Sequence, residues 1–139
     1  MGNKSALIGY IAYGQHILEF SHQLSSGLDD IRAAILNREY QKLESLNQTI
    51  TSLTHRLAEA DLKRYAMAKR LGCQDRQYTK VIQAKLQGGV LQRVQALDKQ
   101  IEQSIGQCKA KLERQGNIML MQHQAMEEAL GKHKLRINV

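Results

Sequence analysis

The chain has 139 residues, no proline, one phenylalanine and a formal net charge of +7. This is the length of one ordinary domain, and the excess of Gln, Leu, Ala, Lys, Arg and Glu is typical of helical bundles and coiled coils. Two cysteines, Cys73 and Cys108, are too few for a disulfide framework and lack metal-site spacing, so we expect reduced thiols.

The N-terminal residues lack a strong targeting signal. The apolar run after Lys4 is short and contains Gly9 and two tyrosines. A myristoylation pattern requires Ser or Thr where this chain has Ala6. No window approaches the ~18 apolar residues of a membrane span. We therefore expect a soluble, cytoplasmic protein.

A first helix is predicted over about residues 4–36. Its second half repeats apolar residues at helical spacing, with Ser21 at the one polar position of the seam: Ile17, Leu24, Leu28, Ile31 and Ile35. Gly9, Gly14 and Gly27 each weaken an exposed helix by about 1 kcal/mol relative to Ala. The first dozen residues are therefore expected to fray or bend.

A second helix is predicted over about 39–71, because its apolar positions alternate steps of three and four. These positions are Leu43, Leu46, Ile50, Leu53, Leu57, Ala60, Arg64, Met67 and Leu71. Such a heptad seam packs along another helix, and the short break Asn37–Glu39 predicts an antiparallel hairpin. A helix that continues through Asn37 remains the alternative.

Arg64 is the one charged residue in this seam. Either it fixes the register of the helices, or its stem packs while its guanidinium reaches solvent. We expect the second arrangement.

Gly72 is suited to the left-handed position after the second helix. A short helix is predicted over about 77–87, and a last helix over about 90–130, with Val90, Val94, Leu97 and Ile101 opening its seam. Gly88-Gly89 predicts a hinge or loop rather than a phosphate site. The fold class is thus all-α, an elongated antiparallel coiled-coil hairpin with a third long helix, forming one domain over 1–131. A basic tail follows over 132–139, for which we expect no fixed structure.

No catalytic or metal-binding pattern is found. One Glu-x-x-His pair, Glu19 and His22, has no second copy, and there is no HExxH motif or nucleophile elbow. We expect surface histidines, no cofactor, no metal and no enzymatic activity.

The segment after Leu112 is rich in methionine. Four consecutive apolar residues, Ile118 to Met121, cover more of a helix surface than one seam can bury, and thioethers adapt to varied partners. Ordinary bundle core is the alternative. The predicted partner-binding residues are Asn117, Ile118, Met119, Leu120, Met121 and Met126.

Three stretches resemble the FlgN family, the flagellar type III export chaperones for hook-associated proteins. They are ILNREYQKLESLNQTITSL (35–53), RLAEADLKRYAMAKRLG (56–72) and LERQGNIMLMQ (112–122). The first looks like the family's hairpin turn, the second like the end of its second helix, and the third like its Leu-rich approach to an Asn followed by a hydrophobic pair. Ile118 departs from that pattern, in which a small residue follows the Asn.

This resemblance implies a chaperone that binds the C-terminal amphipathic helices of hook–filament junction proteins. It would prevent their premature assembly and deliver them to the type III export apparatus. The alternative is a coiled-coil stalk or adaptor of a secretion ATPase, similar to FliJ-like proteins. Nucleic-acid binding through Lys132–Arg136 is a third reading, which we do not favour because no aromatic residues interleave the basic ones.

Overall fold

The computed structural model describes residues 2–115. It contains three long helices, α1 (Gly2–Leu36), α2 (Leu43–Arg70) and α4 (Gly88–Gln115), with a short helix α3 (Thr79–Ala84) and a 3-10 turn η1 (Tyr40–Lys42). No strand occurs in this range. The all-α fold class, a hairpin with a third long helix, is confirmed.

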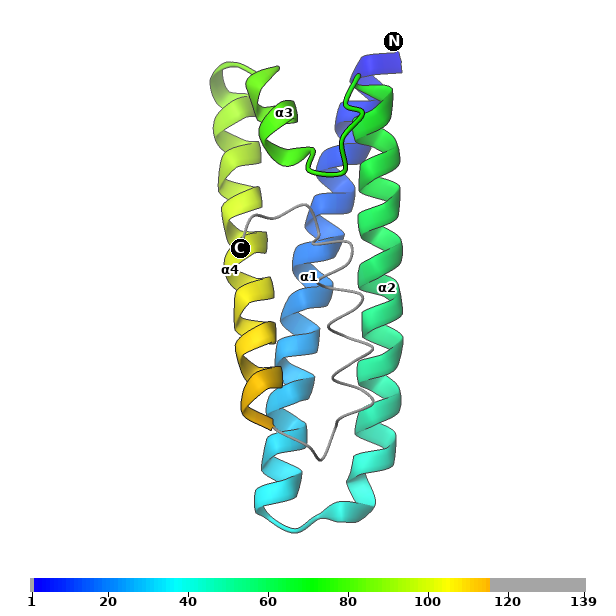
Figure 1. Ribbon diagram of the computed structural model, residues 1–139, viewed down its shortest axis with the longest axis vertical. Coiled ribbons are helices and arrows are strands. Elements are labelled where there is room, and N and C mark those ends of the chain that lie inside the picture. The colour runs from blue at the N-terminus through cyan, green and yellow to red at the C-terminus, as the bar shows by residue number, and fades with distance from the viewer. Residues whose placement is uncertain (1, 116–139) are drawn as a thin grey trace.

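Helix α1 is the central element of the bundle. Figure 1 shows it between α2 and α4, with α2 running antiparallel to it and α4 running parallel to it. α1 packs against both helices, whereas α2 and α4 make few contacts with each other. The segment between α2 and α4, which includes α3, therefore spans one end of the bundle.

The turn between α1 and α2 closes with the hydrogen bonds of a Schellman motif. Arg38 occupies the left-handed position with φ 57°, and the Glu39 N–H donates to the carbonyl of Ala34 at 2.8 Å. The chain then passes through η1, so α2 begins at Leu43 rather than near Glu39. The alternative of one helix continuing through Asn37 is ruled out.

Helix α1 continues through its three glycines, and the expected fraying of its first dozen residues is not seen. α1 is continuous from Gly2, and a Cβ built on Gly9, Gly14 or Gly27 would come within 3 Å of a side chain of α2. These side chains are Met67, Arg64 and Ile50 respectively. The glycines therefore serve close packing between α1 and α2, and this packing outweighs their low helix propensity.

Two apolar clusters fill the interior. The larger one joins the middle of α1, α2 and α4 and includes Ile17, Leu24, Leu57, Ile101 and Ile105. The smaller one lies at the α3 end and comprises Tyr10, Ala68, Cys73, Tyr78, Ile82 and Val94. The α2 seam is buried at Ile50, Leu53 and Leu57 as predicted, whereas Leu46 is only half-buried.

The connection from α2 to α4 contains two glycines with positive φ. Gly72 has φ 96°, as its predicted position after α2 requires, and Gly88 has φ 64°. Gly88 and Gly89 form the first residues of α4, and residues 85–87 separate it from α3. Val90, assigned to the last seam, is 44% exposed because the first turn of α4 lies at the end of the bundle.

Candidate functional site

The predicted partner-binding residues lie outside the described part of the chain. They are Asn117, Ile118, Met119, Leu120, Met121 and Met126. What the structure describes is the frame that leads to them, because α4 is followed to Gln115. Contacts at both ends of α4 fix this helix in the bundle.

Polar contacts fasten the second half of α4 to α1. The hydroxyls of Ser21 and Ser104 lie 2.6 Å apart in the core. Farther along, the Lys111 ammonium donates to the Ser25 hydroxyl and to Asp29, at 2.7 and 2.8 Å. These contacts fix the position of α4 along the axis of α1. Apolar packing alone specifies that position less strictly.

The described end of α4 is held in the same way. The Gln115 side-chain amide donates to the carbonyl of Leu28 at 2.6 Å. Leu28 belongs to the buried seam of α1. α4 is thus fixed to α1 as far as Gln115, the last described residue.

The other end of α4 is held by a buried cluster around Arg64, which we call the Arg64 cluster. Its members come from all four helices: Tyr10, Asp61, Arg64, Tyr78, Gln83 and Asp98. Arg64 has no exposed surface, and its guanidinium donates to the Asp98 carboxylate at 2.8 Å and to the Tyr10 carbonyl at 3.1 Å. The expectation that this guanidinium reaches solvent is wrong.

Gly14 lets Arg64 cross α1. A Cβ at Gly14 would lie 2.7–2.9 Å from three atoms of the guanidinium group, closer than real contacts allow. Arg64 belongs to α2 and Asp98 to α4, so their ion pair joins the two outer helices over the central one. Arg64 thus contacts all three long helices at one position, as expected of the register-fixing role first considered for it.

Two tyrosines enclose the buried charge. The Arg64 guanidinium lies 4.0 Å from the centre of the Tyr10 ring and 5.8 Å from that of Tyr78. Burial, the largest effect, raises the pKa of both phenols above its ordinary value, so both stay neutral at physiological pH. Such cation–π contacts strengthen when they are desolvated, and here they offset part of the cost of burying the guanidinium.

The cluster also fixes α3. The Tyr78 hydroxyl donates to Asp61 of α2 at 2.9 Å, and the Gln83 amide donates to the second carboxylate oxygen of Asp98 at 2.8 Å. α3 is a short helix of six residues, and it would not be stable alone. Its place thus depends on polar bonds to α2 and α4 as well as on the burial of Ile82.

Sequence reasoning missed most of this cluster. Arg64 was visible as a charge in an apolar seam, but Asp98 and Asp61 stand one residue beside their seams and look like ordinary flanking acids. Gly14 looked like a weak point of a helix. The available signal was the combination of a seam arginine with seam-adjacent acids on other helices, and only the structure shows which acid faces it.

The described residues offer no evident metal centre. No group of three or more His, Cys, Asp or Glu side chains in the described range is placed to bind a metal ion. His16, His22 and His55 are exposed, as expected of surface histidines. Cys73 and Cys108 are buried and free, and burial raises the pKa of Cys108 to about 12.

No helix between residues 2 and 115 is long and apolar enough to cross a membrane. Comparison of the chain with known protein families, with curated proteins and with solved structures gave no match.

Proposed function

We propose that this protein is an export chaperone that binds the C-terminal amphipathic helices of flagellar hook-associated subunits. It would keep these helices from associating prematurely and deliver the subunits to the type III export apparatus. Binding by a helix laid in an apolar groove requires no catalytic group, only a rigid scaffold and an adaptable apolar surface. The assignment rests on the sequence resemblance together with the described bundle.

One observation supports the proposal more than any other, and it is the way α4 is attached. Polar contacts hold α4 to α1 from Ser104 to Gln115, and Asp98 joins α4 to Arg64 of α2, so the helix that precedes the predicted binding residues is fixed in the bundle. A segment that binds a foreign helix gains affinity when its support is ordered in advance.

The third long helix also favours a chaperone over the alternative, a stalk or adaptor of a secretion ATPase. Stalk proteins of the FliJ-like kind are usually two long, densely charged helices. Here α4 packs along α1 for most of its length and contributes Ile101, Ile105 and Cys108 to the larger apolar cluster. This supports a bundle rather than a bare two-helix rod.

The test uses the full chain and a synthetic peptide of a hook-associated subunit's C-terminal helix. Leu120→Asp combined with Met121→Asp should abolish binding while leaving helicity and melting temperature nearly intact. Truncating an anchor at an interface centre typically costs about 2 kcal/mol or more, which is roughly thirtyfold in affinity.

The matched control is Leu53→Ala at a buried seam position of α2. It should lower stability by about 2–5 kcal/mol and leave the affinity of the folded protein unchanged. If the double variant unfolds, the two residues belong to the core. If it stays folded and binds at full strength, the proposed site is wrong.

A further inference from the structure

The α3 end of the bundle carries a pocket that neither the Arg64 cluster nor the proposed chaperone site uses. Four half-buried or buried apolar side chains from α1, α3 and the connections after α2 and α3 line it: Leu7, Leu71, Ile82 and Leu86. Its volume is about 500 Å³. A cavity of this size with mainly apolar walls is within the usual range for ligand sites.

Two lysines stand at the edge of this pocket. Lys4 and Lys85 are exposed, and neither forms an ion pair with any residue in the described range. The Lys85 ammonium lies close to Gly72, at 3.6 Å from where a Cβ would stand. An apolar hollow flanked by unpaired ammonium groups suits a ligand with an apolar body and negative charges beside it.

The surroundings of the pocket have the same sign of charge. Residues 3–9 and 66–90 form this end of the molecule, and Asp75 is their one acid. Against it stand six exposed basic residues: Lys4, Lys69, Arg70, Arg76, Lys80 and Lys85. At the opposite end, residues 27–48 and 109–115 carry five acids and six basic residues, so the charges there nearly balance. Among residues 2–115, the excess of positive charge is thus larger around the pocket than at the opposite end, and it would guide an acidic partner to the pocket.

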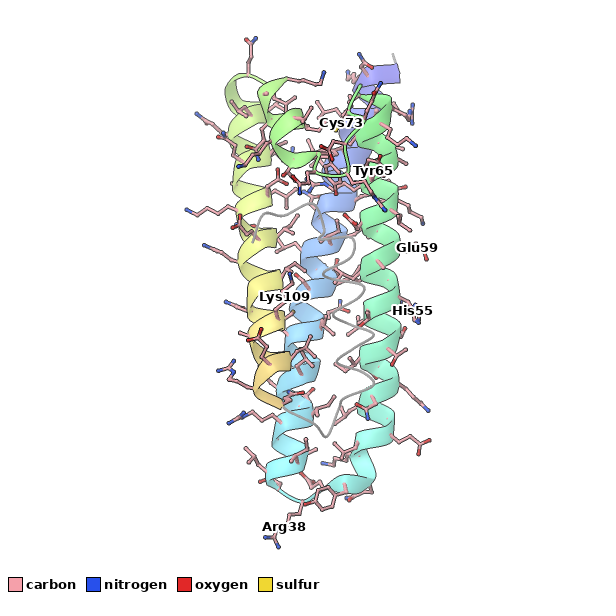
Figure 2. The ribbon with its side chains drawn as sticks, viewed as in Figure 1. Arg38, His55, Glu59, Tyr65, Cys73 and Lys109 are labelled. Carbon is pink, nitrogen blue, oxygen red and sulfur yellow. The ribbon has the colours of Figure 1, made fainter. Side chains whose placement is uncertain are left out.

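The aromatic side chains at this end disfavour nucleic acid as the occupant. Binding of single strands relies on exposed rings on which bases stack. Here Tyr10 and Tyr78 are buried, and Tyr65 stacks on Tyr78 and has the cations of Lys69 and Arg76 over its ring, at 5.5 and 5.3 Å. Figure 2 shows Tyr65 beside the loop that carries Cys73.

The shape of the site disfavours a membrane surface. Membrane-binding faces present protruding apolar side chains to the lipid. At this site the leucines and Ile82 line a concavity, and the exposed apolar side chains of this end, Ile8, Val81 and Val90, are not part of its lining. The apolar group therefore has to be supplied by the ligand.

We propose that this pocket docks an acidic segment of a partner protein, which inserts one or two large apolar side chains between Leu7, Leu71 and Leu86 while its carboxylates meet Lys4 and Lys85. The pocket shares no residue with the proposed chaperone site, and the proposal does not depend on the proposed function.

The test is a selection from a random peptide display library, with peptides of about 12 residues, on the immobilised full chain at about 0.15 M salt. Enriched peptides should contain a large apolar residue flanked by Asp or Glu. Their affinity should fall by about tenfold or more with Lys4→Glu combined with Lys85→Glu, and should weaken as salt is raised. Replacing the peptide's apolar residue with Ser should also abolish binding.

The matched control is Arg32→Glu on α1 combined with Lys109→Glu on α4, which makes the same change in net charge away from the pocket. It should leave the affinity within about twofold, since long-range charge is screened at this salt. The proposal is overturned if no peptide is enriched, if enriched peptides lack acids, or if both double variants bind equally.

Two further probes separate the other occupants. Vesicles of phosphatidylcholine with phosphatidylserine, and a single-stranded RNA of about 30 nucleotides, are measured under the same salt. If either binds more tightly than the peptides and loses binding with the Lys4 and Lys85 substitutions, the surface recognises that class and not an acidic protein segment. If vesicles or RNA bind weakly, and equally to both double variants, the acidic peptide remains the specific ligand of the pocket.

Discussion

Arg64 lies at a seam position where α2 otherwise presents apolar side chains, and it is fully buried. Removing a guanidinium from water is costly, and an ion pair repays that cost only when its other donors are also satisfied. Asp98, the Tyr10 carbonyl and the Tyr10 ring supply that compensation. A buried pair of this kind is better regarded as specifying alignment than as a large source of stability.

A double-mutant cycle tests this account of the pair. Arg64→Met should cost about 3–5 kcal/mol of unfolding free energy, because it leaves the Asp98 carboxylate without its cation. Asp98→Leu should cost a similar amount for the reverse reason. The two together should cost much less than the sum, with a coupling of roughly 2 kcal/mol or more, measured by urea unfolding. Additive losses would mean that the two side chains do not interact.

Gly14 and Gly106 should respond oppositely to the same substitution. In an open helical position Gly→Ala stabilises by about 1 kcal/mol, and Gly106 of α4 has nothing within 4 Å of its Cβ position. At Gly14 the new methyl group would displace a guanidinium fixed by Asp98, so Gly14→Ala should destabilise by about 1–3 kcal/mol. The melting temperatures of the two variants test this prediction. A higher melting temperature for both would contradict the close contact between Arg64 and Gly14.

At the scale of the element, both ends of the hairpin use the same helix-ending geometry with different residues. α2 ends on Gly72, whereas α1 ends with Arg38 in the left-handed conformation. A non-glycine residue there is strained by roughly 1 kcal/mol.

Arg38→Gly should therefore raise the unfolding free energy by about 0.5–1 kcal/mol, and Gly72→Ala should lower it by about 1 kcal/mol. Both changes are read from chemical denaturation at neutral pH. Arg38 is exposed at the tip of the hairpin, as Figure 2 shows, so loss of its side chain removes few contacts. A loss of stability with Arg38→Gly would contradict this view of the turn.

The helices could be predicted from the sequence because their seams repeat at a fixed interval within one segment. The spacing of Ile50, Leu53 and Leu57 predicts that they share one face of a helix, and no other helix is needed for that prediction. The bond from Arg64 to Asp98 joins residues 34 positions apart in the sequence, and no periodicity relates them. The same holds for Gly14, whose purpose depends on a side chain of α2. The local pattern thus predicted the helices, whereas the contacts of the Arg64 cluster could be identified only in the three-dimensional structure.

At the scale of the whole molecule, both apolar clusters contain groups that resist ionisation. Burial raises the pKa of Cys108 from its ordinary value near 9 to about 12, and raises the pKa of Tyr10 and Tyr78 as well. In each case the folded state holds its proton more tightly than the unfolded state does. Stability from these groups is fully present below about pH 8 and is lost as the pH rises through 9 and beyond.

Urea unfolding at pH 8, 9 and 10, with reductant present, should show this loss. Cys108 alone should contribute about 1 kcal/mol of it by pH 10. Cys108→Ser keeps a similar shape but does not ionise, so it should make the decline between pH 8 and 10 shallower by that amount. If the free energy of unfolding falls equally with pH in the two proteins, the Cys108 thiol has an ordinary pKa in the folded state.

The crossing of Arg64 over Gly14 constrains how this sequence can evolve. Replacing Gly14 alone crowds the guanidinium, replacing Arg64 alone strands a carboxylate, and replacing Asp98 alone strands a cation. Each single replacement is expected to lower stability, so we expect a lineage either to keep the three residues or to change them together. Any related protein with a larger residue at the position of Gly14 should therefore also lack arginine at the position of Arg64.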